Sequence, residues 1–227
     1  AGLRDLHLDL GHVGVFRALA AEARLSEELE GDLFEALQRK ARSQIEALLA
    51  TCDAPTGAKA MLAVLADLNG GTETLIRARE LLKGAPPAVQ VALINLERVA
   101  DAVTTAGTPV YIDLAELRGY RYYTGVVFSA FVSGHGQAVA QGGRYDGIGR
   151  AFGRARAATG FSTDLRRLLR LVSTDAAGLK GILAPHTGTK GLDERMATLR
   201  AAGECVVARL PGDSSSARAL GCDRELV

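Results

Sequence analysis

The stretch RGYRYYTGVVF, residues 118–128, concentrates tyrosine and arginine in a chain that is otherwise poor in aromatic residues. The 227-residue chain has 5 Tyr, 6 Phe and no Trp, and all its tyrosines lie within one stretch of 35 residues. Residues 120–132 are rich in Tyr, Val and Phe, which indicates a β-strand. Since alternate residues of a strand share a face, Arg118, Tyr120 and Tyr122 are expected to point the same way.

Further strands are predicted on both sides of this stretch. Residues 109–117 precede it with a period-two pattern, and residues 137–143 follow it after SGHG, which is a tight-turn signal. We therefore expect residues 118–132 and 137–143 to pair as an antiparallel hairpin. The Gly-rich passage GGRYDGIGRAFG leads into a short helix, AATGFST is one more strand, and DLRRLLRLV is a helix after it.

The N-terminal half is helical in pattern after a first strand. Residues 1–12 alternate Leu with polar residues, and residues 13–106 repeat apolar residues at helical spacing. Asp32 and Glu35 have the spacing of a capping box and would start a helix. Its apolar stripe comprises Leu33, Leu37, Ala41, Ile45 and Leu48. Further helices are predicted for KAMLAVLADL, for TLIRARELL, and from Pro86-Pro87 to Gly107. The simplest interpretation of this half is a helical packing module.

The C-terminal residues predict a small α/β unit. From Gly181 onward, GILAP, LDERMATLRAAG and ECVVARL have the patterns of strand, helix and strand. The chain starts without Met inside an alternating pattern and stops on an apolar residue, so we expect a fragment of a longer protein or a chain with unseen termini.

Composition excludes several classes of protein. The net charge of +1 lacks the basic excess of a broad nucleic-acid surface, and no apolar run approaches the length of a membrane span. The 3 Cys are far apart and odd in number, so neither a disulfide framework nor a zinc knuckle is indicated, and a reduced, cytoplasmic setting is expected. The 4 His have no metal-binding spacing, so no metal site and no cofactor are predicted.

The arginines and tyrosines together suit a small zwitterion that carries a ring. Arg118 can hold a carboxylate, and tyrosines can offer a hydroxyl to a ring nitrogen and a flat face for stacking. The neighbouring GGRYD adds Gly142 and Gly143, where backbone can approach a ligand, and then Tyr145. The alternative is a tyrosine-rich sheet face packed beneath the helical module. The basic residues Arg144, Arg150, Arg154 and Arg156 are either a solvated face or an anion- or partner-binding patch.

Three ordered motifs resemble those of histidyl-tRNA synthetases. RGYRYYTGVVF is similar to RGLDYYTGTVFE of that family, QGGRYDGI is similar to GGGRYDGL, and ATGFSTDLRRLL resembles the third class II motif, roughly GFAIGIERL. The resemblance covers residues 109–170 directly and residues 1–108 more loosely, through a strand and a helical insertion. It implies that Arg118, Tyr122, Tyr123 and Tyr145 surround an amino acid. With Gly142 and Gly143 they form the predicted histidine-binding set.

Five positions depart from these motifs, and a working adenylate-forming site is not expected to tolerate all five changes. Arg121 replaces Asp, Ser129 replaces Glu, and Gln141 replaces the first Gly of a triplet. In the third motif Asp164 replaces Gly and Arg166 replaces Glu, whereas Arg167 keeps the arginine of the family. A carboxylate at position 164 adds bulk and negative charge beside a phosphate, which weakens binding. The departures predict a site retained for histidine and lost for ATP.

That profile resembles a paralogous family, the regulatory subunits of ATP phosphoribosyltransferase. The resemblance implies an α+β fold: a class II synthetase-like antiparallel sheet (residues 1–18 and 108–176), a helical insertion (19–107) and a small C-terminal α/β unit (177–227). It also implies a non-catalytic subunit that acts in the first step of histidine biosynthesis and in its feedback regulation. The expected partners are a short-form catalytic subunit, further copies of the protein, and L-histidine, with no membrane and no nucleic acid.

Two other interpretations remain open from the sequence. One is the catalytic core of a histidyl-tRNA synthetase with altered motifs, and the other is a plain amino-acid-binding module without such a partner. The first two class II motifs are absent, as expected if roughly the first third of the protein is missing from this chain.

Overall fold

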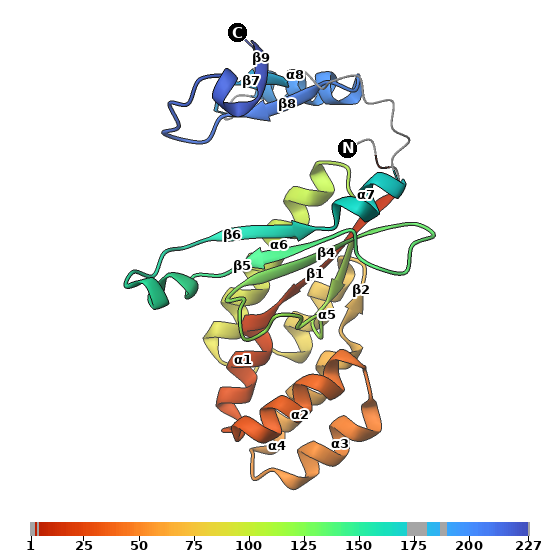
Figure 1. Ribbon diagram of the computed structural model, residues 1–227. Coiled ribbons are helices and arrows are strands. Elements are labelled where there is room, and N and C mark those ends of the chain that lie inside the picture. The colour runs from red at the N-terminus through yellow and green to blue at the C-terminus, as the bar shows by residue number, and fades with distance from the viewer. Residues whose placement is uncertain (1–2, 4, 172–180, 187–189, 227) are drawn as a thin grey trace. The chain divides into compact units, whose positions relative to one another are not determined.

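The computed structural model describes residues 3, 5–171, 181–186 and 190–226, which form two compact units (Figure 1). The division between the units falls at Leu168 and Leu169, within helix α7 (Leu165–Leu171). The α+β class predicted from the sequence is confirmed. The predicted three-part division of the chain stays a prediction. Among the described residues, no helix has both the length and the apolar character needed to cross a bilayer.

The first unit is built on a mixed six-stranded sheet with strand order β2-β3-β1-β4-β5-β6. The central strand β1 pairs in parallel with β3 and antiparallel with β4, and the remaining neighbours are antiparallel. The strands are β1 (Leu6–His12), β2 (Asn69–Gly70), β3 (Val110–Asp113), β4 (Val126–Val132), β5 (Ala140–Arg144) and β6 (Thr159–Thr163). The predicted antiparallel hairpin is therefore confirmed as β4–β5, and the strand predicted from AATGFST as β6.

The helices α1 and α6 lie against one face of the sheet (Figure 1). Alternation along β1 explains this arrangement, because Leu8 and Leu10 belong to the same apolar core as Phe16 of α1 and Leu93 of α6. The other side chains of β1, such as Asp9, face the opposite side of the sheet. The helices of this unit are α1 (Val13–Glu22), α2 (Glu27–Gln38), α3 (Arg42–Thr51), α4 (Thr56–Val64), α5 (Glu73–Leu81) and α6 (Pro87–Thr105).

The predicted capping box at Asp32 and Glu35 is wrong. Helix α2 is capped six residues earlier, where the Ser26 hydroxyl accepts a hydrogen bond from the Leu29 amide at 3.2 Å. Glutamates occupy the first turn after Ser26, which favours the positive end of the helix dipole. A serine cap followed by acidic residues is thus the stronger start signal, and Asp32 lies inside the helix. The predicted apolar stripe belongs to two helices, α2 and α3, separated at Lys40, whose φ is 52°.

The predicted strands at 109–117 and 120–132 are shorter than expected. Residues 114–125 form successive turns instead, with the Tyr120 amide bonded to the Leu117 carbonyl and the Tyr123 amide to the Gly119 carbonyl. Gly119 has φ of 66°, a left-handed conformation that glycine adopts without strain. The tyrosines at 120, 122 and 123 therefore lie on a turn, which we call the tyrosine turn (residues 117–125), and the expected sharing of one strand face is wrong.

The second unit contains a three-stranded parallel sheet with strand order β8-β7-β9. Its core is formed by Ile182, Ala184, Met196 and Val206. The predicted strand, helix and strand are confirmed as β7 (Gly181–Ala184), α8 (Lys190–Ala201) and β8 (Cys205–Ala208). Strand β9 (Cys222–Glu225) was not predicted, because CDRE is short and polar. Three short 3-10 helices complete the elements: Leu65–Asp67, Ile148–Phe152 and Arg218–Leu220.

Close packing at Gly11 places the end of β3 directly over β1. A Cβ atom at Gly11 would lie 2.8 Å from the Glu116 carbonyl oxygen and 2.9 Å from that of Asp113. Both obstacles are backbone atoms, which cannot rotate away as a side chain can. The absence of a side chain at position 11 is therefore required for the path of residues 113–116.

We predict that Gly11→Ala lowers the free energy of unfolding by about 1–3 kcal/mol, the usual cost of overpacking. Gly31→Ala is the matched control, because a Cβ at Gly31 in α2 would meet nothing within 4 Å. That substitution should raise stability by about 0.5–1 kcal/mol through helix propensity. Denaturant unfolding of the full-length protein measures both, and equal effects of the two variants would contradict the role of Gly11.

His12 joins β1 to α1 and is buried as a neutral imidazole. Its Nδ1 accepts a hydrogen bond from the Gly14 amide at 3.1 Å and so caps α1. The side chain is 7% exposed, and burial lowers its pKa from 6.5 to about 4, with Arg144 and Arg17 adding to the shift. Because the unfolded chain binds a proton more readily, the folded state loses stability as the pH falls through 6.5 toward 4.

We predict that this residue contributes about 2 kcal/mol to the loss of stability between pH 8 and pH 5. His12→Asn keeps a capping side chain without the titration, so its free energy of unfolding should fall less over that range. Chemical denaturation at several pH values gives the comparison. Parallel pH profiles for wild type and variant would show that His12 does not titrate in this way.

Candidate functional site

Arg17 of α1 fixes the tyrosine turn on the first unit. Its Nη2 donates to the carbonyl oxygens of Tyr120 and Tyr123, at 2.6 and 3.1 Å. The guanidinium carbon also lies 5.2 Å from the centroid of the Tyr120 ring, within cation–π range. Tyr120 itself packs against Phe16 and Phe34, with ring centroids about 5.5 Å apart. Arg17 and Tyr120 therefore anchor the turn, and the Tyr120 ring packs against the apolar core.

The three other tyrosines of the motifs form one aromatic cluster. The centroid of Tyr122 lies 5.0 Å from that of Tyr123 and 4.9 Å from that of Tyr145. Tyr123 and Tyr145 are 6.3 Å apart. Tyr122 is 45% exposed, and desolvation together with the neighbouring phenols raises its pKa. The cluster presents aromatic surface that is accessible from solvent.

A cavity of about 330 Å³ opens beside this cluster, on the sheet face opposite to α1 and α6. Val127 and Ser129 of β4 and Gln141 of β5 lie along its floor. Arg118 and Glu116 line one side, and Tyr122 and Tyr123 are also among its lining residues. A volume near 300 Å³ lies at the small end of the range for small-molecule sites.

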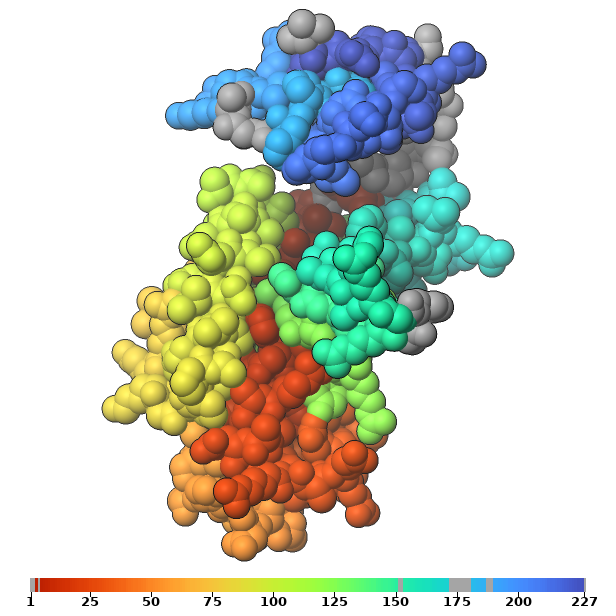
Figure 2. Space-filling model, turned by 90° about the vertical axis from the view of Figure 1, so that its left-hand side faces the viewer, coloured from red at the N-terminus to blue at the C-terminus, as the bar shows by residue number. Residues whose placement is uncertain are grey.

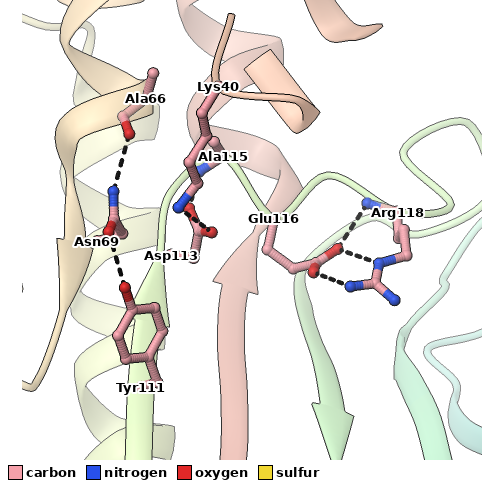
Figure 3. Close-up of polar contacts among 8 residues, drawn as sticks. All are labelled: Lys40, Ala66, Asn69, Tyr111, Asp113, Ala115, Glu116 and Arg118. Carbon is pink, nitrogen blue, oxygen red and sulfur yellow. Dashed lines mark hydrogen bonds and ion pairs between the residues drawn. The ribbon is translucent and has the colours of Figure 1, made fainter. Parts of the chain in front are cut away.

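Glu116 and Arg118 form a bidentate ion pair at the rim of this cavity (Figure 3). Arg118 donates from Nε to Oε1 at 3.1 Å and from Nη2 to Oε2 at 2.9 Å, and its backbone amide donates to Oε1 at 3.1 Å. The Glu116 side chain is 9% exposed, whereas that of Arg118 is 50% exposed. Arg118, which was predicted to bind the carboxylate of a ligand, is thus already paired with the carboxylate of Glu116.

Other polar contacts fix the segment that leads into this pair (Figure 3). Asp113 accepts from Lys40 Nζ at 2.9 Å and from the Ala115 amide at 2.9 Å. Asn69 donates to the Ala66 carbonyl and accepts from the Tyr111 hydroxyl at 2.8 Å. Asp9 lies on the same side of the sheet, and burial raises the pKa of its carboxyl.

The structure brings four of the six predicted histidine-binding residues to the cavity: Arg118, Tyr122, Tyr123 and Gly142. Gly143 is not among its lining residues; a Cβ at this position would lie 2.6 Å from the Val126 carbonyl oxygen and 2.9 Å from the Tyr123 ring. Tyr145 contributes by packing against Tyr122. At Gly142 a Cβ would lie 2.7 Å from the Phe128 ring. Both glycines are therefore required by ring packing, whether or not a ligand approaches.

Two of the departures from the synthetase motifs are neighbours on the cavity floor. Ser129 and Gln141 face each other across β4 and β5 in register. The Ser129 hydroxyl thus lies where the synthetases have a glutamate carboxylate. Beside it lies the Gln141 amide, where the synthetases have a glycine and so no side chain. Arg121 lies elsewhere, in a surface depression with Glu27 and Glu30 of α2.

The altered third motif stabilises its own helix. The Asp164 carboxylate accepts from the amides of Arg166 and Arg167, at 2.9 and 3.2 Å, and so caps α7. Arg167 donates from Nη1 to the Ala138 carbonyl at 2.6 Å and from Nη2 to the Gln137 side chain. The amides and the arginine of this motif are occupied by the chain itself. No contact shown by the described residues explains the substitution at Arg166.

Sequence reasoning missed Glu116. An acidic residue two positions before an arginine is a weak signal, since such pairs are common on protein surfaces. Its burial depends on residues 113–116 crossing Gly11, which becomes evident only from the fold.

A second, larger groove of about 1150 Å³ lies on the opposite face of the sheet, between α6 and strands β4 to β6. Figure 2 looks toward this side, between α6 in yellow-green and the segment after β5 in green. Val91 and Phe161 are among its exposed apolar residues, at 58% and 71%. Arg144 is the one member of the predicted basic patch that lines the groove among the described residues. Its hydrogen bond lowers the pKa of Asp146.

Within the described part of the chain, no group of three or more His, Cys, Asp or Glu side chains is arranged to hold a metal ion.

The comparisons with known proteins agree with the motifs. The family model described as histidyl-tRNA synthetase matches residues 1–168, and the model of the ATP phosphoribosyltransferase subunit HisZ C-terminal domain matches residues 179–227. An ATP phosphoribosyltransferase regulatory subunit from Pseudomonas aeruginosa strain LESB58 is 53% identical over 231 aligned positions, which cover 100% of this chain and 58% of the relative. The chain thus spans somewhat more than half the length of such relatives.

Solved structures resemble the chain in the same way. An ATP phosphoribosyltransferase regulatory subunit/histidyl-tRNA synthetase from Bacillus halodurans matches with a TM-score of 0.66 and 26% identity, covering 99% of this chain and 59% of that one. An ATP phosphoribosyltransferase (HisG:HisZ) complex from Thermotoga maritima shares the fold, with a TM-score of 0.53 and 18% identity, covering 70% of this chain and 53% of that one. The predicted class II synthetase-like fold is confirmed. The chain therefore belongs to the histidyl-tRNA synthetase-like family, within the branch of the ATP phosphoribosyltransferase regulatory subunits.

Proposed function

We propose that the full-length protein is the non-catalytic regulatory subunit of an ATP phosphoribosyltransferase, the enzyme of the first step of histidine biosynthesis. The relative with 53% identity carries that name, and the C-terminal residues match the domain model of the same subunit. The proposed partners are a short-form catalytic subunit and further copies of the protein itself. A cytoplasmic location follows from this role.

The observation that carries the proposal is the self-capped third motif. A helix N-terminus with free amides attracts a phosphate, but the Asp164 carboxylate already accepts from two of these amides in α7. Its negative charge also repels an anion. With Arg167 bonded to the Ala138 carbonyl, both kinds of group that could hold a phosphate in this motif already have partners within the chain. A synthetase that must form an adenylate needs that site, whereas a regulatory subunit does not.

We further propose that the cavity beside the tyrosine cluster binds free L-histidine. Arg118 supports a carboxylate, because its Nη1 donates no hydrogen bond to the other described residues and half of its side chain is exposed. The rings of Tyr122 and Tyr123 supply flat walls for an imidazole, and Tyr145 supports them from behind. Gly142 permits the close packing of β5 under this site. Gly143 belongs to the proposed set through its contact with the Tyr123 ring. Binding here would make the complex sensitive to histidine.

Reconstitution with the catalytic subunit tests the regulatory role. We expect the full-length protein to co-purify with a short-form ATP phosphoribosyltransferase and to raise its activity at least tenfold. The protein alone should show no histidine-dependent exchange of pyrophosphate into ATP. Asp164→Gly should not restore exchange, because Ser129, Gln141 and Arg121 also differ from the synthetases.

Robust pyrophosphate exchange by the wild-type protein would instead favour the alternative, a histidyl-tRNA synthetase core. Histidine binding without any effect on a catalytic subunit would favour a plain amino-acid-binding module.

Isothermal titration with L-histidine tests the ligand site. Arg118→Ala removes charge-assisted hydrogen bonds worth about 1.5–3 kcal/mol, so affinity should fall about tenfold to a hundredfold. Tyr123→Phe should cost less, about 0.5–1.5 kcal/mol, if one neutral hydrogen bond is lost. Arg98→Ala is a control on the opposite face of the sheet, where Arg98 lines the larger groove. Unchanged affinity in a folded Arg118→Ala protein would place histidine elsewhere.

A further inference from the structure

We propose that Glu116 determines specificity in this cavity by accepting the α-ammonium group of the ligand. Together with Arg118 it would select the zwitterion of an α-amino acid over a plain carboxylate or a plain amine. The inference rests on the proposed histidine site and adds a role for a residue that the synthetase-like motifs do not include.

The geometry of the ion pair leaves one side of Arg118 available. Glu116 occupies Nε and Nη2, at 3.1 and 2.9 Å. A guanidinium has five N–H donors in a fixed plane, so the side formed by Nη1 and Nη2 can still hold a second carboxylate with two parallel hydrogen bonds. Glu116 thus orients Arg118 without using all of its donors.

Glu116 likewise keeps accepting capacity. Its Oε1 accepts from the Arg118 amide and from Nε, whereas Oε2 accepts from Nη2 as its one donor among the described residues. A carboxylate oxygen can accept about two hydrogen bonds, so Oε2 retains one site. The side chain is 9% exposed and lines the cavity, which makes the cavity the side from which a donor can reach it.

The charges around the pair favour a ligand with both signs. Arg118 and Glu116 carry opposite charges side by side. A ligand with a carboxylate and no ammonium group would be repelled by Glu116, and a ligand with an amine and no carboxylate would be repelled by Arg118. Asp113 is already bound to Lys40 at 2.9 Å. Asp9 is not among the residues that line the cavity, and burial raises the pKa of its carboxyl. Glu116 is therefore the carboxylate best placed for an ammonium group.

Titration of the full-length protein with three related ligands tests this role. L-Histidine carries both groups, imidazole lactate replaces the ammonium with a hydroxyl, and histamine lacks the carboxylate. Wild type should prefer histidine over imidazole lactate by about tenfold to a hundredfold, the value of one charge-assisted hydrogen bond. In Glu116→Gln that preference should shrink to within about threefold, through weaker binding of histidine. The preference over histamine should persist, because it depends on Arg118.

Two further variants separate this role from a loss of folding. Glu97→Gln removes a carboxylate of α6 that pairs with Arg79 and does not line the cavity, and it should leave the ligand preferences unchanged. Glu116→Asp keeps the charge on a shorter side chain and should restore part of the preference that Glu116→Gln loses. Thermal unfolding of each variant shows whether it is folded.

The outcomes distinguish this inference from the proposed function. If wild type binds none of the three ligands, the histidine site is absent and the inference falls with it. If wild type binds histidine and Glu116→Gln keeps the full preference over imidazole lactate, the role of Glu116 is refuted while the histidine site stands. Equal ligand ratios in the Gln and Asp variants would also refute it.

Discussion

Close packing between Gly11 and residues 113–116 is the constraint on which the candidate site depends. The backbone at Asp113 and Glu116 lies so near β1 that a single methyl group at position 11 would collide with two carbonyl oxygens. This crossing brings Glu116 to the cavity rim, sets the start of the tyrosine turn, and places Arg118 over β4. Arg17 then anchors the far end of the turn through Tyr120 and Tyr123. The site is thus determined by backbone packing at one end and by the half-buried Arg17 guanidinium at the other.

The described site also suggests how a synthetase-like fold can lose one ligand and keep room for another. In the third motif, groups that could bind a phosphate bind the chain instead: Asp164 accepts from the first amides of α7, and Arg167 donates to Ala138. At the cavity, the hydrogen bonds within the chain use fewer of the available donors. Glu116 accepts from Nε and Nη2 of Arg118 and leaves the other side of the guanidinium available. A polar group that forms hydrogen bonds within the chain has little effect on the free energy of folding, because it exchanges one set of hydrogen bonds for another. It can nevertheless lose its ability to bind a ligand while the architecture stays the same.

Much of the fold could be predicted from the sequence, because periodicity and turn signals reflect local physics. The hairpin β4–β5, strand β6 and the helix that Pro87 opens all follow such signals. The tyrosine turn does not, since Tyr has a high strand propensity and the turn is imposed by tertiary contacts at Gly11 and Arg17. The motifs indicated Arg118, Tyr122 and Tyr123. Glu116 could not be found in this way, because its burial depends on a backbone crossing between segments about one hundred residues apart.

The aromatic cluster has a spectroscopic consequence. This part of the protein has no tryptophan, and three of its five tyrosines pack with ring centroids between 4.9 and 6.3 Å apart. Phenol transitions at such separations couple strongly and in a fixed geometry, so the near-ultraviolet circular dichroism of these residues comes mainly from the cavity wall. This part of the protein therefore carries an intrinsic optical signal at its candidate site.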